Sequence, residues 1–69
     1  MSPQEAYKSL DLAKGLGIDR VEAQFLKLKS EMEEKIASTS NERLNQIYST
    51  RLDQVEEAYL VLIEHFEVG

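Results

Sequence analysis

The chain has 69 residues, no cysteine, one histidine and a formal net charge of −5 at neutral pH. This length suffices for one small domain with a thin core, and the lack of cysteine excludes disulfides and thiolate metal sites. The negative charge disfavours DNA, RNA and anionic membranes as partners, because all three attract basic surfaces. We therefore expect no nucleic-acid partner.

The first residues predict a short helix over residues 3–14. Ser2 can cap this helix, Pro3 suits its first position and Glu5 completes a capping box. Gly15 and Gly17 are expected to end it, because glycine readily takes the left-handed conformation that follows many helices.

A second, strongly amphipathic segment predicts a helix over residues 20–37, with Asp19 as its N-cap. Apolar residues recur there every three or four positions, as they do on one face of a helix. This apolar stripe consists of Val21, Phe25, Leu28, Met32 and Ile36.

A third helix is predicted over residues 41–66, after a polar turn in which Thr39 and Glu42 offer another capping box. Its apolar stripe consists of Leu44, Ile47, Tyr48, Leu52, Val55, Ala58, Tyr59, Leu62 and Phe66. Because the turn is short, the second and third helices should lie antiparallel, with the first packed on this hairpin. The prediction is a single all-α domain over residues 1–69, a three-helix bundle that can also be a module of a larger protein.

The sequence lacks a convergent catalytic or metal-binding constellation. His65 is the only histidine and lies near the end of the third helix, where it can interact with the helix dipole. The acidic clusters lack the Glu-x-x-His motif of di-metal bundles. This absence favours the interpretation that their carboxylates are solvent-exposed surface charge. We expect no enzymatic activity, no cofactor and no metal.

No segment of the sequence resembles a membrane span or a secretion signal. The longest purely apolar run is Tyr59–Ile63, which is much too short to cross a bilayer, and the first residues lack a basic, apolar signal pattern. We expect a cytoplasmic protein with no direct membrane insertion by this segment.

The apolar run in the third helix also predicts a second apolar face. Leu60, Val61 and Ile63 cannot all point at the same core; Leu60 and Ile63 lie at helical spacing on a second face, which Leu26 of the second helix can extend. Its rim is acidic and would favour a basic protein partner; it consists of Glu56, Glu57, Glu64 and Glu67. Two interpretations stay open: the face contacts a partner, or it is covered by the first helix or by sequence that follows Gly69.

Three segments, in the right order, resemble the J-domain, the module of DnaJ-type co-chaperones that stimulates Hsp70. Ala6–Leu12 (AYKSLDL) is similar to the family's first helix, and Ile18–Leu28 (IDRVEAQFLKL) to the start of its second helix. Val55–Leu62 (VEEAYLVL) is similar to its third helix and is the closest local match. The resemblance implies the J-domain fold, a bundle of three helices.

The signature on which J-domain activity depends, His-Pro-Asp in the loop after the second helix, is absent. The aligned residues are Glu33, Glu34 and Lys35, and the helical pattern continues through them. Degenerate J-like domains of this kind typically serve as docking modules, sometimes by pairing with a true J-domain. The resemblance therefore implies a non-catalytic protein–protein interaction domain that does not stimulate the Hsp70 ATPase. Its expected partner is the Hsp70 machinery, a true J-domain or, as the alternative function, a second copy in a structural homodimer.

Overall fold

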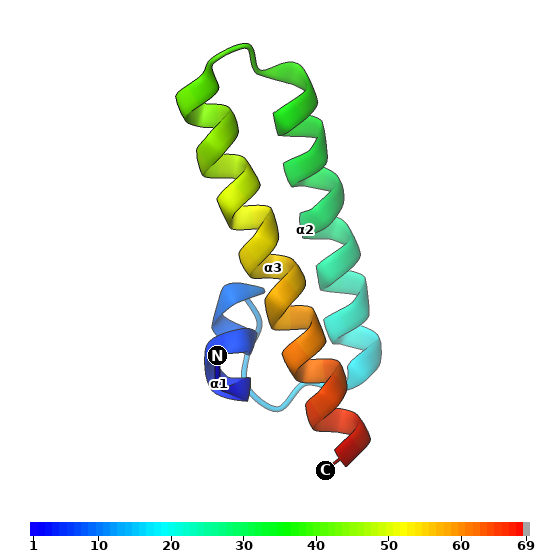
Figure 1. Ribbon diagram of the computed structural model, residues 1–69. Helices are drawn as coiled ribbons and strands as arrows, with labels where there is room; N and C mark the ends of the chain where they lie inside the picture. The colour runs from blue at the N-terminus through cyan, green and yellow to red at the C-terminus, as the bar shows by residue number, and fades with distance from the viewer. Residues whose placement is uncertain (69) are drawn as a thin grey trace.

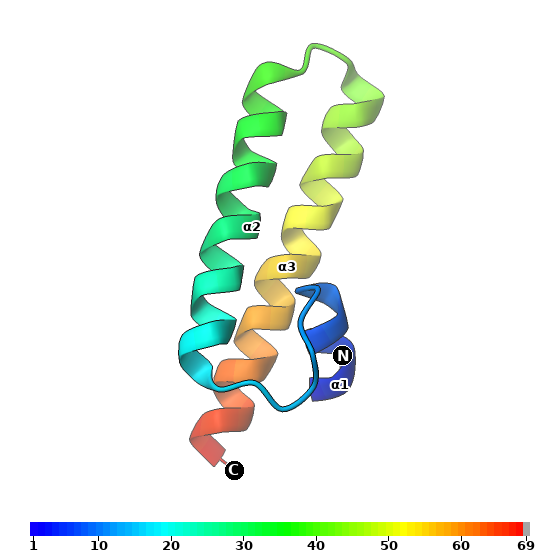
Figure 2. The same ribbon diagram turned by 180° about the vertical axis from the view of Figure 1, so that it is seen from behind.

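The computed structural model describes residues 1–68, which form three helices: α1 (Pro3–Ser9), α2 (Ile18–Ser38) and α3 (Glu42–Val68). No strand occurs within these residues. α2 and α3 form a long antiparallel hairpin, and α1 packs on α3 at the end of the hairpin that lies away from the α2–α3 turn (Figures 1 and 2). The molecule is elongated, with principal extents of 42 × 20 × 18 Å. The predicted all-α three-helix bundle is confirmed.

The predicted start of α1 is confirmed, but its predicted end at residue 14 is wrong. Ser2 caps the helix through its Oγ, which accepts a hydrogen bond of 3.3 Å from the Glu5 amide. The helix ends at Ser9 because Asp11 adopts a left-handed conformation with φ of 56°.

The hydrogen bonds around Asp11 form a Schellman motif. The Leu12 amide donates to the Tyr7 carbonyl over 2.9 Å, and the Asp11 amide donates to the Lys8 carbonyl over 3.0 Å. These two bonds satisfy carbonyls that the end of a helix leaves without a partner. Asp11 thus occupies the position that glycine most often takes, and Gly15, with φ of 89°, shapes the later turn instead.

α2 begins two residues earlier than predicted, and α3 begins one residue later. Each of the two helices extends one or two residues past its predicted end. Asp19 is not the cap of α2; Gly17 occupies that position, without a side-chain hydrogen bond. In α3 the cap is Asn41 rather than Thr39, because the Asn41 Oδ1 accepts a hydrogen bond of 3.1 Å from the Leu44 amide. These are differences of one or two residues in otherwise correct helices.

The core is concentrated where α1 covers the hairpin. Leu10 from the end of α1 and Leu62 from α3 are completely buried. On α3 every fully buried side chain lies at or after Val55, and none lies between Glu42 and Gln54. The buried apolar residues are Ala6, Tyr7, Leu10, Val21, Leu28, Met32, Val55, Ala58 and Leu62. The half of the hairpin next to the α2–α3 turn is therefore a two-helix structure with a thin interior.

Two side-chain hydrogen bonds fasten the segment between α1 and α2. The Tyr7 hydroxyl, on a side chain that is almost wholly buried, donates to the Leu16 carbonyl over 2.9 Å. The Gln24 Nε2 of α2 donates to the Leu10 carbonyl over 2.9 Å. Because each bond satisfies a backbone carbonyl beside the core, the connection between α1 and α2 is held in place although it has no regular secondary structure.

Candidate functional site

The side chain of Leu60 is the most exposed of the large apolar residues, with 66% of its surface accessible. It lies on the C-terminal half of α3, where α1 does not bury it. Helical spacing explains this exposure, because Leu60 is two positions from the buried Leu62 and therefore points to the opposite side of the helix. The side chains of the apolar run Tyr59–Ile63 were expected not to face one core together, and this expectation is confirmed for Leu60.

Four carboxylates surround Leu60 on the surface of α3. Glu56 and Glu64 lie one turn before and one turn after it, and Glu57 lies three residues before it. Glu67, seven residues later, extends the same face by another turn. All four side chains are exposed, and none forms an ion pair with another residue in the described part of the chain. The result is an apolar centre within an uncompensated acidic rim.

Ile63 is half-buried and joins this face to the edge of the core. It lies one helical turn after Tyr59, whose ring stacks on that of Phe25 from α2 with centroids 4.1 Å apart and planes 8° from parallel. The Lys29 Nζ lies 5.8 Å from the centre of the Phe25 ring. We refer to Leu60 and Ile63, with Glu56, Glu57, Glu64 and Glu67, as the Leu60 patch.

Leu26 lies at the same level of the hairpin, next to Phe25, and is 55% exposed. It lines a shallow hollow on α2 with Asp19, Glu22 and Ala23. Lys29 lies three residues after Leu26, so this second apolar side chain has surroundings of mixed charge, unlike Leu60.

A second exposed apolar surface lies on the N-terminal half of α3, and the sequence pattern did not reveal it. Leu44 and Ile47 were assigned to the core stripe, yet they are 42% and 55% exposed. The cause is the short α1: its end lies level with Arg51, whose Nη2 is 3.6 Å from the Asp11 Oδ2. Beyond that point the described residues form no third helix over the hairpin (Figure 1).

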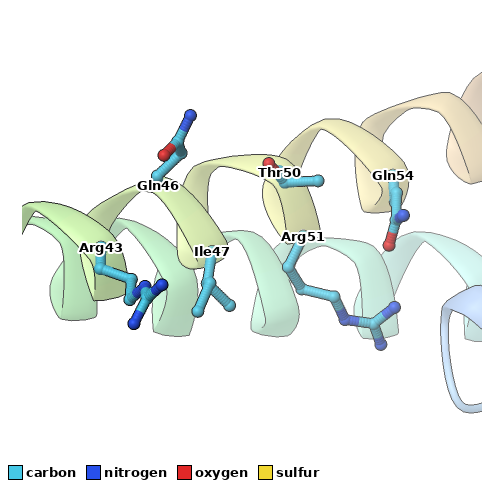
Figure 3. Close-up of a pocket in the computed structure, with 6 residues that line it drawn as sticks. All are labelled: Arg43, Gln46, Ile47, Thr50, Arg51 and Gln54. Atoms are coloured by element: carbon cyan, nitrogen blue, oxygen red, sulfur yellow. The ribbon is translucent and has the colours of Figure 1, made fainter.

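Two arginines flank Ile47 at the same spacing at which glutamates flank Leu60. Arg43 lies one turn before Ile47 and Arg51 one turn after it, and the three side chains project to the same side of α3 (Figure 3). They border an open hollow together with Gln46, Thr50 and Gln54. On the neighbouring helix, the Lys35 Nζ lies 5.6 Å from the centre of the Tyr48 ring. We refer to Arg43, Ile47 and Arg51 as the Ile47 patch, an apolar centre with a basic rim.

A third hollow lies between α1, the linking segment and the last turns of α3. It is lined by Ser2, Pro3, Gln4, Tyr7, Lys14, Gly15 and His65. The Ser2 hydroxyl is used in the helix cap, because it accepts from the Glu5 amide and donates to the Glu5 Oε1. His65 lies in the last turn of α3, and its ring is tilted by 56° against that of Phe66, with centroids 5.8 Å apart.

Within the described residues no three His, Asp or Glu side chains are positioned to hold a metal ion. Among the same residues, no helix combines the length and the apolar character that crossing a membrane requires. Comparison with known proteins yields no match to a family model, a curated protein or a solved structure.

Proposed function

We propose that this chain is a non-catalytic protein-docking domain that binds its partner through the Leu60 patch. The observation that carries the proposal is the 66% exposure of Leu60 among four exposed glutamates. An apolar side chain in this setting contributes free energy only when a partner covers it, and its acidic rim selects a partner surface with basic residues.

The proposal includes a degenerate J-like character. It is supported by the way in which the three segments that resemble the J-domain meet. Tyr7 of the first segment is buried, Phe25 of the second stacks on Tyr59 of the third, and Val55 is completely buried. The residues that give the resemblance are thus those that hold the three helices together.

The proposed domain does not stimulate Hsp70. Glu33, Glu34 and Lys35, which align with the His-Pro-Asp signature, lie inside α2, and this helix continues to Ser38. A loop that could present the signature residues is replaced by helix at this point. The basic residues of α2 are also balanced by acidic ones, so the helix offers no continuous basic face.

Photo-crosslinking in cells tests the docking function. A photoreactive amino acid in place of Leu60 should give a discrete covalent adduct with one protein, whereas the same amino acid at Ser30, an exposed position on α2, should not. With the purified partner, Leu60→Ser should weaken binding by about tenfold or more, because an apolar side chain at the centre of an interface is left uncovered. The absence of an adduct at position 60, or unchanged affinity of Leu60→Ser, contradicts the proposal.

The Hsp70 part of the proposal has its own assay. ATP hydrolysis by a bacterial Hsp70 should stay at its basal rate when this chain is added, while a J-domain that contains His-Pro-Asp, added at the same concentration, accelerates it. Amide shifts of the labelled chain on addition of Hsp70 and ATP then show whether binding survives without stimulation. Acceleration by this chain would contradict the assignment as a non-stimulating domain.

A further inference from the structure

The Leu60 patch and the Ile47 patch match each other in spacing and are opposite in charge. In the first, Glu56 and Glu64 lie four residues to either side of an exposed leucine. In the second, Arg43 and Arg51 lie four residues to either side of an exposed isoleucine. In each patch the two charged residues are therefore about 12 Å apart along the helix axis, with the apolar side chain midway between them.

We propose that the partner of the Leu60 patch is the Ile47 patch of a second copy of this chain. Placing Ile47 of one copy against Leu60 of the next brings both arginines opposite glutamates at the same time. This inference rests on the proposed function, because it names the basic, apolar-centred surface that the Leu60 patch binds.

The charges on both patches are available for such a contact. Arg43 has no ion-pair partner among residues 1–68, and the four glutamates of the Leu60 patch have none there either. Arg51 is paired with Asp11 at 3.6 Å, but the Asp11 side chain is 68% exposed and the pair is open to solvent. An exposed pair of this kind is weak and exchanges its partner at little cost.

The two patches lie on different sides of α3, which determines the kind of assembly. Leu60 follows Ile47 by 13 residues, which corresponds to about 20 Å along the axis and about 140° around it at 3.6 residues per turn. One symmetric contact between two copies therefore cannot bury both patches. The contact is heterologous, each copy using its Leu60 patch on one neighbour and its Ile47 patch on another, and such contacts build head-to-tail rings or open chains.

The net charge of −5 opposes any contact between copies, so a specific arrangement is needed to bring them together. Arg43 and Arg51 lie on the half of α3 that precedes Val55, whereas Glu56, Glu57, Glu64 and Glu67 lie on the half that follows it. A head-to-tail contact places these halves against each other, whereas a contact between two acidic halves is repelled. The charge pattern thus favours the heterologous contact over a symmetric contact between two Leu60 patches.

Sedimentation of the purified chain and of two variants tests this inference. In Arg43→Gln/Ile47→Gln the Ile47 patch is removed, and in Leu60→Gln/Glu64→Gln the Leu60 patch is removed. All four positions are exposed and glutamine is a good helix former, so both variants should keep the helicity and melting temperature of the original chain. Matched controls are Arg20→Gln and Glu33→Gln, which make the same charge changes at exposed positions of α2 outside both patches.

The unaltered chain and both controls should show an average mass that rises beyond that of a dimer as concentration increases. Each patch variant alone should have a lower average mass than the unaltered chain at the same concentration, because its association is weakened by about tenfold or more. An equimolar mixture of the two patch variants should form a 1:1 dimer that grows no further, because each contributes the patch that the other lacks.

A chain that remains monomeric at all concentrations, or a mixture that fails to form the dimer, overturns the inference. An assembly that stops at a dimer and depends only on the Leu60 patch overturns it as well. Crosslinking separates this failure from failure of the proposed function: an adduct between position 60 and a different protein retains the docking domain and removes the second copy as its partner.

Discussion

The left-handed conformation of Asp11 determines where α1 ends, and substitutions at this position test that account. With φ of 56°, the position suits glycine, whereas alanine there brings a strain of about 1–2 kcal/mol. Alanine also restricts the unfolded chain more than glycine does, and this entropic effect stabilises the alanine variant by about 0.4–1 kcal/mol. Since Asp11→Gly and Asp11→Ala both remove the carboxylate that faces Arg51, the loss of the ion pair cancels between them.

We therefore expect Asp11→Gly to be more stable than Asp11→Ala by about 0.5–1 kcal/mol, which corresponds to a melting temperature higher by roughly 2–8 °C in a domain of this size. Urea unfolding followed by circular dichroism measures the difference. The same pair of substitutions at Lys8, exposed within α1, is the control, and there alanine should be the more stable because the residue is helical. Equal stability of the two Asp11 variants, or a preference for alanine, would refute the assignment of Asp11 as the residue that ends α1.

Two further predictions concern the core and its polar contact. Leu62→Ala should lower the free energy of unfolding by about 2–5 kcal/mol because Leu62 is completely buried, whereas Leu60→Ala should change it by no more than about 0.5 kcal/mol. Urea unfolding of both variants measures this difference. Similar losses of stability in the two variants would contradict the prediction. Tyr7→Phe removes the donor to the Leu16 carbonyl and should cost about 0.5–1.5 kcal/mol in thermal unfolding, while Tyr48→Phe, whose hydroxyl makes no hydrogen bond within residues 1–68, should cost less. If Tyr48→Phe lowered the stability as much as Tyr7→Phe, the hydrogen bond between Tyr7 and the linking segment would not be stabilising.

The sequence was sufficient for the number, order and pairing of the helices. The stripe from Val21 to Ile36 and that from Leu44 to Phe66 repeat at helical spacing over many turns, and the short polar turn between them leaves only an antiparallel hairpin. Signals of this length tolerate errors in single residues, which is why both long helices were predicted to within two residues.

The end of α1 could not be predicted in the same way. Leu10 and Ala13 continue the apolar spacing, and the two later glycines offered a conventional stop. The conformation of Asp11 depends instead on the hydrogen bonds that Leu12 makes back to Tyr7 and on the burial of Leu10 against α3. Those contacts belong to the folded molecule and are not visible in the local sequence.

The Leu60 patch was named from the sequence, and the structure leaves Leu60 exposed and Ile63 half-buried. The Ile47 patch was not anticipated, because a helical stripe does not show how far along the hairpin a third helix reaches. One feature of the sequence could have indicated the exposure of Ile47. Arg43 and Arg51 place charges one turn before and one turn after it, on a stripe that was predicted to be core.

The chain contains no cysteine, so a single introduced thiol reports on one position only. Whether a partner covers Leu60 can be measured by comparing the alkylation rate of Leu60→Cys in cells with that in the dilute purified chain. Ala37→Cys, at an exposed position near the end of α2, serves as the control. A partner that covers Leu60 should protect Leu60→Cys in cells, while Ala37→Cys should react equally fast in both settings. Equal reactivity of Leu60→Cys in the two settings would contradict the claim that this surface is a docking site.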